Sequence, residues 1–365
     1  MKLISRQHYL DKIERYLGKD TIIILTGQRR VGKSFVLRLF KDKVSTNPDN
    51  NIIYINKEKK EFDEIKNYQD LNAYIDERRD ESRMNYVLVD EIQDIEEFEK
   101  SVRSYYEEPD IELIITGSNS KMLSKDIITA FRGRGDQIHI YPLSFKEYYE
   151  ACGLPLEDAY LEYQYFGGMP LVLSKHSDEE KMSYLKELFS EIYIKDVVDR
   201  NGIKDEDAFT RLLSVLSSSI GSYTNPSNIE NTFLSEMHVT YNHETIGHHI
   251  NYIKDAFLVS EAKRYDIKGK KYIGANSKFY FTDIGLRNAL INFRQSEPTH
   301  IMENIIYNEL FYREFNVDVG VVEYNYKDED KKSHRTQLEI DFVANKNSKR
   351  YYIQYGGARC AEAWC

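Results

Sequence analysis

Short apolar runs alternate with helical patterns over the first part of the chain. Each run has the length of a strand and is rich in Ile, Val or Leu, which is typical of a buried strand. Five such runs lie at residues 22–26, 51–55, 86–89, 111–116 and 137–141. Segments with apolar residues at helical spacing lie between them. The pattern predicts an α/β fold with a parallel sheet, helices on both faces and a ligand site at the carboxyl ends of the strands.

The rest of the chain follows other patterns. Helical periodicity dominates residues 151–205, broken by a Gly-Gly-Met-Pro sequence. Residues 206–292 show three helical segments and then a strand hairpin, the order of a winged helix-turn-helix. Residues 293–365 begin with a helical pattern and continue with strands. We therefore expect an α/β domain at 1–150, followed by a small helical domain, a winged helix and a second α/β segment with these bounds.

The loop after the first predicted strand has the P-loop pattern of two glycines followed by Lys-Ser. Glycine lets the backbone turn so that its N–H groups line a nest for phosphate oxygens, and the next helix directs its positive end at the same anion. Lys33 is expected to reach the β- and γ-phosphates, and Ser34 to ligate Mg²⁺. The strand before and the helix after disfavour a chance match. The expected ATP-binding residues are Gly27, Gln28, Arg29, Arg30, Val31, Gly32, Lys33 and Ser34.

Two carboxylates follow the third predicted strand. Asp90 and Glu91 come directly after the apolar residues 86–89. In P-loop ATPases the first acid of such a pair holds Mg²⁺, and the second orients or deprotonates the attacking water. Asp90 is therefore a predicted metal residue, together with Ser34, and Glu91 the predicted base.

Two further pairs of residues each have two possible roles. Ser118 and Asn119 follow the fourth strand, where they either sense the γ-phosphate and water or form an ordinary strand-end turn. Arg132 and Arg134 lie in a Gly-rich loop before the fifth strand. Either of them acts in trans as an arginine finger, which requires a homo-oligomer, or both are surface residues.

The motifs occur in a familiar order. They are Gly-Gln-Arg-Arg-Val-Gly-Lys-Ser, Val-Asp-Glu-Ile-Gln, Thr-Gly-Ser-Asn-Ser, and a Gly-Arg pair before Tyr-Pro-Leu-Ser-Phe-Lys-Glu-Tyr. This order resembles a large group of prokaryotic AAA+-type ATPases, over most of the chain from Met1 to about Gln354. The resemblance implies an AAA+-like module, a helical lid over the nucleotide (151–205), a winged helix and a C-terminal domain of unknown function with a restriction-endonuclease-like core.

The predicted hairpin of the winged helix is locally basic. Residues 263–278 contain six basic residues and one acid, in a chain with a net charge of −10. Phosphate contact with double-stranded DNA is one interpretation. Docking of a protein partner, with lysines that protect a sheet edge, is the other. The candidate nucleic-acid-binding residues are Lys263, Arg264, Lys268, Lys270 and Lys271.

The last segment resembles the start of a restriction-endonuclease core, whose metal site needs two acids and then Glu-x-Lys. Glu303 and Asp341 match the first two positions, but Gln354 and Gly356 occupy the places of the Glu and the Lys. Without that carboxylate the metal loses a ligand, and without the ammonium the attacking water loses its positively charged partner. We therefore expect no nuclease activity.

Composition indicates the cellular compartment and shows that the C-terminal tail is unusual. No run of about 18 apolar residues or signal peptide is present, so no membrane contact is expected. Three cysteines in 365 residues make a disulfide framework implausible, which favours the cytoplasm. Two of them, Cys360 and Cys365, lie with the only tryptophan in the last six residues. The hypothesis is that this tail is truncated or frame-shifted.

These observations predict an ATP-hydrolysing AAA+-type switch or remodeller that binds DNA through its winged helix. The alternative is an ATP-dependent protein-interaction switch that binds no nucleic acid.

Overall fold

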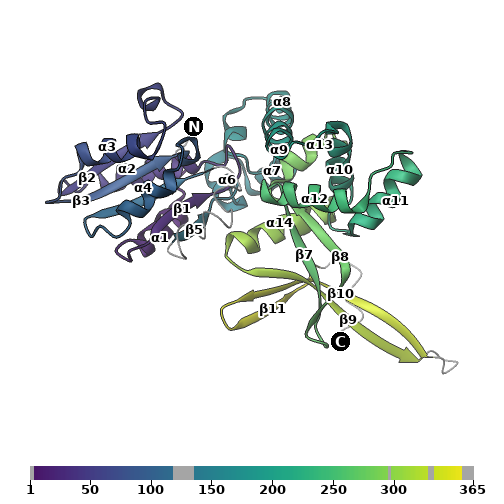
Figure 1. The fold of residues 1–365 in the computed structure, drawn as a ribbon. Coiled ribbons are helices and arrows are strands. Elements are labelled where there is room, and N and C mark those ends of the chain that lie inside the picture. Colours follow the sequence, from purple (N-terminus) through teal and green to yellow (C-terminus); the bar gives the residue numbers. More distant parts are fainter. Residues whose placement is uncertain (1–3, 118–134, 295–296, 328–332, 356–365) are drawn as a thin grey trace. The chain divides into compact units, whose positions relative to one another are not determined.

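The computed structural model describes residues 4–117, 135–294, 297–327 and 333–355. The chain divides into two compact units, Met1–Leu143 and Ser144–Cys365 (Figure 1). The second unit begins at Ser144, just before helix α6 (Phe145–Cys152). Each unit is described by itself.

The first unit contains a five-stranded parallel sheet in the order β2-β3-β4-β1-β5. The five predicted strands are confirmed, with small changes at their ends. The bounds are β1 Ile22–Thr26, β2 Asn50–Asn56, β3 Met84–Asp90, β4 Ile111–Thr116 and β5 Gly135–His139. In this order the carboxyl ends of β1, β3 and β4 lie at one edge of the sheet, where a ligand is expected.

Helices cover both faces of this sheet because successive strand residues point to opposite sides. Val87 and Val89 join a core with helices α3 (Tyr68–Arg78) and α4 (Phe98–Tyr105). The remaining elements of this unit are α1 Gln7–Tyr16, α2 Lys33–Val44 and the short 3-10 helices η1 Lys60–Phe62 and η2 Ile92–Asp94. Helix α2 packs on the sheet as well, so the helix that begins at the P-loop is fixed by the core.

The second unit begins with helices. Besides α6 they include α7 Leu156–Phe166, η4 Pro170–Ser174, α8 Asp178–Glu187, the π-helical turn η5 Leu188–Ile194 and α9 Lys195–Asn201. Further along the chain lie α10 Glu206–Ser218, α11 Pro226–Glu236, α12 His243–Asp255, α13 Ile284–Leu290 and α14 Pro298–Tyr312. The order α10, α11, α12 and then a hairpin agrees with the three helical segments expected for a winged helix.

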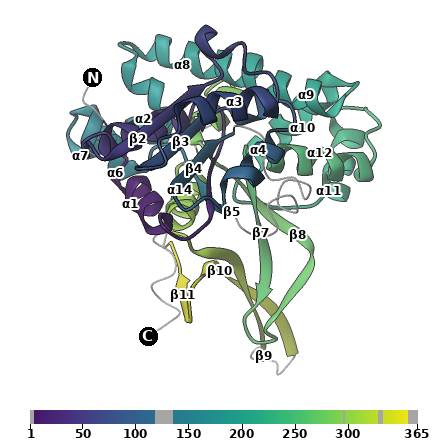
Figure 2. The ribbon, with the colours of Figure 1, turned by 60° about the vertical axis from the view of Figure 1, so that its left-hand side comes forward.

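A six-stranded sheet joins two segments that the sequence predicts as separate domains. Its order is β11-β10-β9-β7-β8-β6. The strands are β6 Tyr223–Thr224, β7 Val259–Asp266, β8 Lys271–Phe281, β9 Asn316–Lys327, β10 Ser333–Lys346 and β11 Lys349–Ile353. Strand β7 of the predicted wing pairs in parallel with β9, and Figures 1 and 2 show β7 to β10 side by side.

The same two segments share one core. The ring of Tyr280, on β8, stacks on that of Tyr307, on α14, with centroids 4.2 Å apart. Ala262, Val319 and Phe342 pack in the same cluster. The segments on the two sides of the expected boundary between 292 and 293 therefore pack together. Strand β9 forms backbone hydrogen bonds with the edge of β7, which would be unpaired in a separate hairpin.

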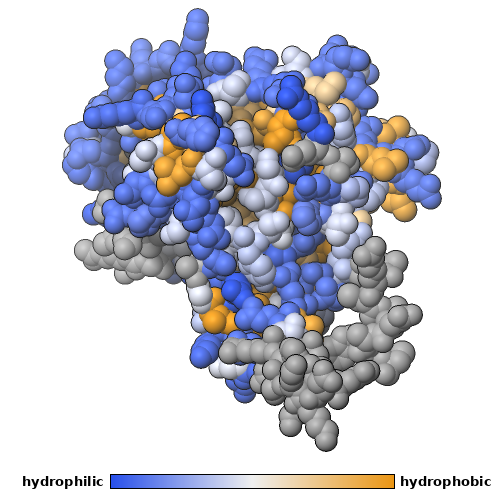
Figure 3. Space-filling model, turned by 90° about the vertical axis from the view of Figure 1, so that its right-hand side faces the viewer, coloured by the Kyte–Doolittle hydropathy of each residue, from blue (hydrophilic) through white to orange (hydrophobic). Residues whose placement is uncertain are grey.

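Figure 3 shows one face, on which hydrophilic residues predominate and apolar residues form scattered groups. Among the described residues, no helix has the length and apolar character needed to cross a membrane.

Candidate functional site

The P-loop follows β1 and turns at two glycines. Gly27 has φ 143°, and a Cβ atom built there would lie 2.2 Å from the carbonyl oxygen of Ile140. Gly32 has φ 98° and is the N-cap of α2. An L side chain would be strained at both positions, so the loop needs glycine to turn into the helix N-terminus. Gln28 and Val31 are buried, whereas Arg29 and Arg30 are exposed.

Lys33 is buried inside this loop. Its side chain is 3% exposed, and Nζ donates to the carbonyl oxygens of Gly27 (3.2 Å) and Gln28 (3.0 Å). Burial lowers the pKa of Lys33, while the nearby carboxylates of Glu91 and Asp90 oppose that shift. The ammonium is thus held by the loop that the sequence predicts to cradle phosphate.

Asp90 gathers three hydrogen bonds at the carboxyl end of β3. The hydroxyls of Ser34 and Thr116 donate to Oδ1 across 3.0 and 2.6 Å, and Asn56 Nδ2 donates to Oδ2 across 3.1 Å. Asp90 is fully buried, and burial raises its pKa, against the hydrogen bonds from Thr116 and Ser34. The predicted pair of Ser34 and Asp90 is therefore brought together. Hydroxyl and carboxylate oxygens are ligands that Mg²⁺ prefers, so these residues fit that ion.

Glu91 lies at the turn between β3 and η2. Its backbone is left-handed (φ 55°, ψ 52°), and its N–H donates to the Thr116 hydroxyl across 2.9 Å. One carboxylate oxygen accepts from Gln93 Nε2 at 2.5 Å, and the other lies 3.9 Å from Lys33 Nζ. Glu91 therefore lies beside both Asp90 and the P-loop lysine.

Three polar residues of this site were missed from the sequence. Asn56 ends β2, Thr116 ends β4, and Gln93 follows β3 by three positions. The signal for the first two was a polar residue at the carboxyl end of a buried strand. The sequence prediction named later residues of the β4 loop, Ser118 and Asn119. These lie outside the described residues, as do Arg132 and Arg134.

The basic hairpin of β7 and β8 has two kinds of cation. Lys263, Lys268, Lys270 and Lys271 are exposed. Arg264 instead donates to Gln337 Oε1 across 2.8 Å, and the Lys268 ammonium donates to the carbonyl oxygen of Glu323 across 3.1 Å. Arg264 and Lys268 therefore hold the hairpin to neighbouring strands.

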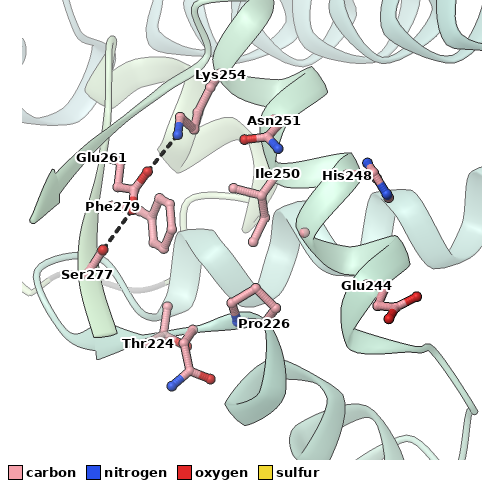
Figure 4. A pocket seen from close by; sticks show the side chains of 12 residues that line it. Thr224, Pro226, Glu244, His248, Ile250, Asn251, Lys254, Glu261, Ser277 and Phe279 are labelled. Atoms are coloured by element: carbon pink, nitrogen blue, oxygen red, sulfur yellow. Dashed lines mark hydrogen bonds and ion pairs between the residues drawn. The ribbon is translucent and has the colours of Figure 1, made fainter. Parts of the chain in front are cut away.

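A pocket of about 430 Å³ lies between α12, the start of α11 and the β7–β8 strands (Figure 4). His248 and Asn251 line it from α12, and both are exposed. Lys254 also reaches it, but its Nζ is paired with Glu261 at 2.6 Å. The pocket therefore presents amide and imidazole groups rather than a concentration of positive charge.

The two acids expected at a nuclease-like metal site have other partners. Lys278 Nζ donates to Glu303 across 2.9 Å and to Glu339 across 2.6 Å, and the Tyr280 hydroxyl donates to Glu303 across 2.5 Å. Burial by itself would lower the pKa of Lys278, but the two glutamates raise it above its usual value. Asp341 accepts from the Tyr355 N–H across 2.6 Å. Among the described residues, no group of three or more His, Cys, Asp or Glu has the arrangement of a metal site.

Comparison with known proteins places these features in a family. A family model described as an AAA domain matches residues 19–149, and a domain of unknown function (DUF8612) matches residues 157–297. An uncharacterized protein of Haemophilus influenzae is 35% identical over 361 residues, which is 96% of this chain and 86% of that protein. The uncharacterized protein MJ1544 of Methanocaldococcus jannaschii is 29% identical over 331 residues, which is 86% of this chain and 70% of that protein.

Solved structures give a weaker likeness. Cdc6p from Pyrobaculum aerophilum is 13% identical with a TM-score of 0.32, over 84% of this chain and 95% of that one. DnaA from Aquifex aeolicus, bound to AMPPCP, is also 13% identical with a TM-score of 0.32, over 70% of this chain and 89% of that one. At these scores we draw nothing about function from them. The relationship to the Haemophilus protein covers nearly the whole chain, and the AAA match encloses Lys33, Ser34, Asp90 and Glu91. The chain therefore belongs to the same family as that Haemophilus protein, and its residues 19–149 match the AAA domain.

Proposed function

We propose that the protein binds ATP with Mg²⁺ at the P-loop and hydrolyses it. The observation that carries this proposal is the contact of the Ser34 hydroxyl with the Asp90 carboxylate across 3.0 Å, with Lys33 and Glu91 beside it. The predicted phosphate, metal and water residues come from two separate stretches of sequence, 27–34 and 90–91, and they meet at one end of the sheet. A chance strand-to-helix turn would not require that meeting.

Each residue then has a separate task. The loop amides and Lys33 hold the β- and γ-phosphates, and Ser34 and Asp90 hold Mg²⁺, which when bound offsets phosphate charge. Glu91 accepts a proton from a water molecule whose oxygen forms a bond to the γ-phosphorus. The bond from that phosphorus to the bridging oxygen breaks, so ADP and phosphate leave. The sensor role of Ser118 or Asn119 and the trans role of Arg132 or Arg134 in a homo-oligomer remain part of this proposal.

Hydrolysis by the wild type is compared with Lys33→Ala and Glu91→Gln. We expect Lys33→Ala to lose ATP binding, and Glu91→Gln to bind ATP but hydrolyse it at least about 100-fold more slowly. Wild-type protein that binds no ATP in the presence of Mg²⁺ would refute the proposal. Equal rates for wild type and Glu91→Gln would remove Glu91 from the mechanism.

We further propose that the second unit binds double-stranded DNA as a winged helix. The order α10, α11, α12 and the β7–β8 hairpin supports this, because α12 has the place of a recognition helix. His248 and Asn251 are exposed on α12, and the amide of Asn can pair with an adenine edge. Exposed Lys263, Lys270 and Lys271 are suited to phosphate. Arg264 and Lys268 are less suited, since they already bind neighbouring strands.

The test is the affinity for duplex DNA measured at several salt concentrations. Lys263, Lys270 and Lys271 are changed together to Glu, and exposed Lys59, Lys60 and Lys66 of the first unit are changed in the same way as a charge-matched control. We expect the hairpin variant to lose affinity and salt dependence, and the control to keep most of both. If both variants behave alike, binding is not at the hairpin. If the wild type does not bind DNA, the alternative function, an ATP-dependent switch for protein partners, is favoured.

We also propose that the last segment has no nuclease activity. The support is the position of the Lys278 ammonium, which lies against the Glu303 carboxylate where an endonuclease-like site would need a metal. Cleavage of plasmid DNA with Mg²⁺ or Mn²⁺ that disappears in Glu303→Gln would contradict this proposal.

A further inference from the structure

Glu91, the base of the proposed reaction, is held by a neighbouring side chain. Gln93 Nε2 donates to Glu91 Oε2 across 2.5 Å. An ionised carboxylate only accepts hydrogen bonds, so the amide nitrogen of Gln93, and not its oxygen, must face Glu91. The backbone of Glu91 is left-handed, which is unfavourable for a residue with a side chain, and such conformations concentrate at functional sites.

The other end of the same amide shows why Gln93 takes this position. Its carbonyl oxygen is buried and has no hydrogen-bond partner among the described residues. A buried acceptor without a donor is energetically unfavourable. The amide would avoid that cost by pointing its oxygen to solvent. Its orientation is therefore set by the contact with Glu91 and not by the needs of its own oxygen.

Lys33 supplies the competing contact. Its ammonium lies 3.9 Å from the other oxygen of Glu91. A closer ion pair would engage the lysine that the phosphates need. The hydrogen bond from Gln93 engages Oε2 of the same carboxylate, and not the Oε1 that lies near Lys33.

We propose that Gln93 is a positioning residue for ATP hydrolysis. Its amide keeps the Glu91 carboxylate separated from Lys33 and oriented to take the proton of the attacking water. This inference rests on the ATPase activity proposed above, and it assigns a role to a residue outside the P-loop and the Asp90–Glu91 pair.

The test uses the full chain with Gln93→Leu and Gln93→Glu. Leucine removes the donor and keeps similar bulk, whereas glutamate keeps the length but places a second carboxylate beside Glu91. For both we expect kcat to fall about 10- to 100-fold. The Kd for ATP, measured by direct binding, should stay within about threefold of the wild type. Gln69→Leu, at an exposed glutamine of the same unit, is the matched control and should retain the wild-type kcat.

A double-mutant cycle separates positioning from other roles. If Gln93 acts through Glu91, Gln93→Leu has little further effect on the residual rate of Glu91→Gln. An equal fold loss in both backgrounds would overturn the inference, as would an unchanged kcat in Gln93→Leu. A parallel loss of ATP affinity and of Tm would show a merely structural role and would also overturn it. These outcomes differ from failure of the proposed function, in which the wild type itself does not hydrolyse ATP.

Discussion

The hydroxyl of Thr116 donates to the Asp90 carboxylate across 2.6 Å and accepts the N–H of Glu91 across 2.9 Å. One buried side chain at the end of β4 therefore fixes both acids at the end of β3. We expect Thr116→Val, which keeps the shape but removes the hydroxyl, to lose about 1–3 kcal/mol of stability because two buried groups lose their partner. Hydrolysis should fall with it.

Thr116→Ser is the control for this prediction, since it keeps the hydroxyl. ATP hydrolysis and thermal unfolding are measured for both variants. Equal rates of ATP hydrolysis and equal unfolding temperatures for Thr116→Val and the wild type would show that the Thr116 hydroxyl contributes to neither activity nor stability.

At Gly27 of the P-loop, any side chain would collide with a backbone carbonyl group. An alanine there would place its Cβ 2.2 Å from the Ile140 carbonyl oxygen, at φ 143°. We expect Gly27→Ala to lose ATP binding and to unfold at a clearly lower temperature. Gly18→Ala provides the comparison, because Gly18 also has positive φ (69°) but has nothing within 4 Å of its Cβ position. That variant should lose only about 1–2 kcal/mol and keep ATP binding. Normal ATP binding by Gly27→Ala would contradict the description of the loop.

Lys278 forms a buried ion pair in the second unit. Lys278→Met would remove the cation from the buried carboxylate of Glu303 and from the exposed carboxylate of Glu339. Loss of one partner of a buried pair, here the pair with Glu303, costs about 3–5 kcal/mol. We expect a large loss of thermal stability near neutral pH. The double variant Lys278→Met, Glu303→Gln should recover part of it, because the carboxylate buried with Lys278 is then neutral. If the double variant is less stable than Lys278→Met by the full cost of Glu303→Gln alone, the two residues are not coupled.

Asp283 makes stability depend on pH. It is the N-cap of α13 and accepts the N–H groups of Leu286 (2.9 Å) and Gly168 (2.7 Å). Burial raises its pKa to about 6, although those backbone hydrogen bonds act in the opposite direction. In the unfolded chain the pKa of an aspartate is about 3.9. The folded state therefore binds the proton more tightly, which adds stability below about pH 4 that is lost as pH rises to about 6.

The shift of this pKa corresponds to roughly 2–3 kcal/mol between the two ends of that range. Asp283→Asn cannot titrate, so the wild type should lose stability relative to this variant between about pH 4 and 6. Tm is measured for both proteins across that range. A constant difference in Tm would exclude Asp283 as the titrating group.

The local features of the nucleotide site were determined by the sequence alone. Gly27, Gly32, Lys33 and Ser34 form one continuous motif, and Asp90 with Glu91 follows an apolar strand, so their type and spacing carry the information. The five strands of the first unit were predictable for the same reason: each is a short apolar run with breakers around it. Helix α3 likewise begins at Tyr68, directly after Asn67, whose side chain caps it.

Only the tertiary structure decided which residues meet. The sheet order β2-β3-β4-β1 brings the ends of β2 and β4 to either side of β3, so Asn56 and Thr116 reach Asp90 from positions 34 and 26 residues away. Likewise, Lys278 appeared as one basic residue of a hairpin. The parallel pairing of β7 with β9 made that hairpin part of a larger sheet, in which Glu303 and Glu339 surround the ammonium. Strand order and long-range pairing depend on how faces and edges are buried, and no local pattern records that.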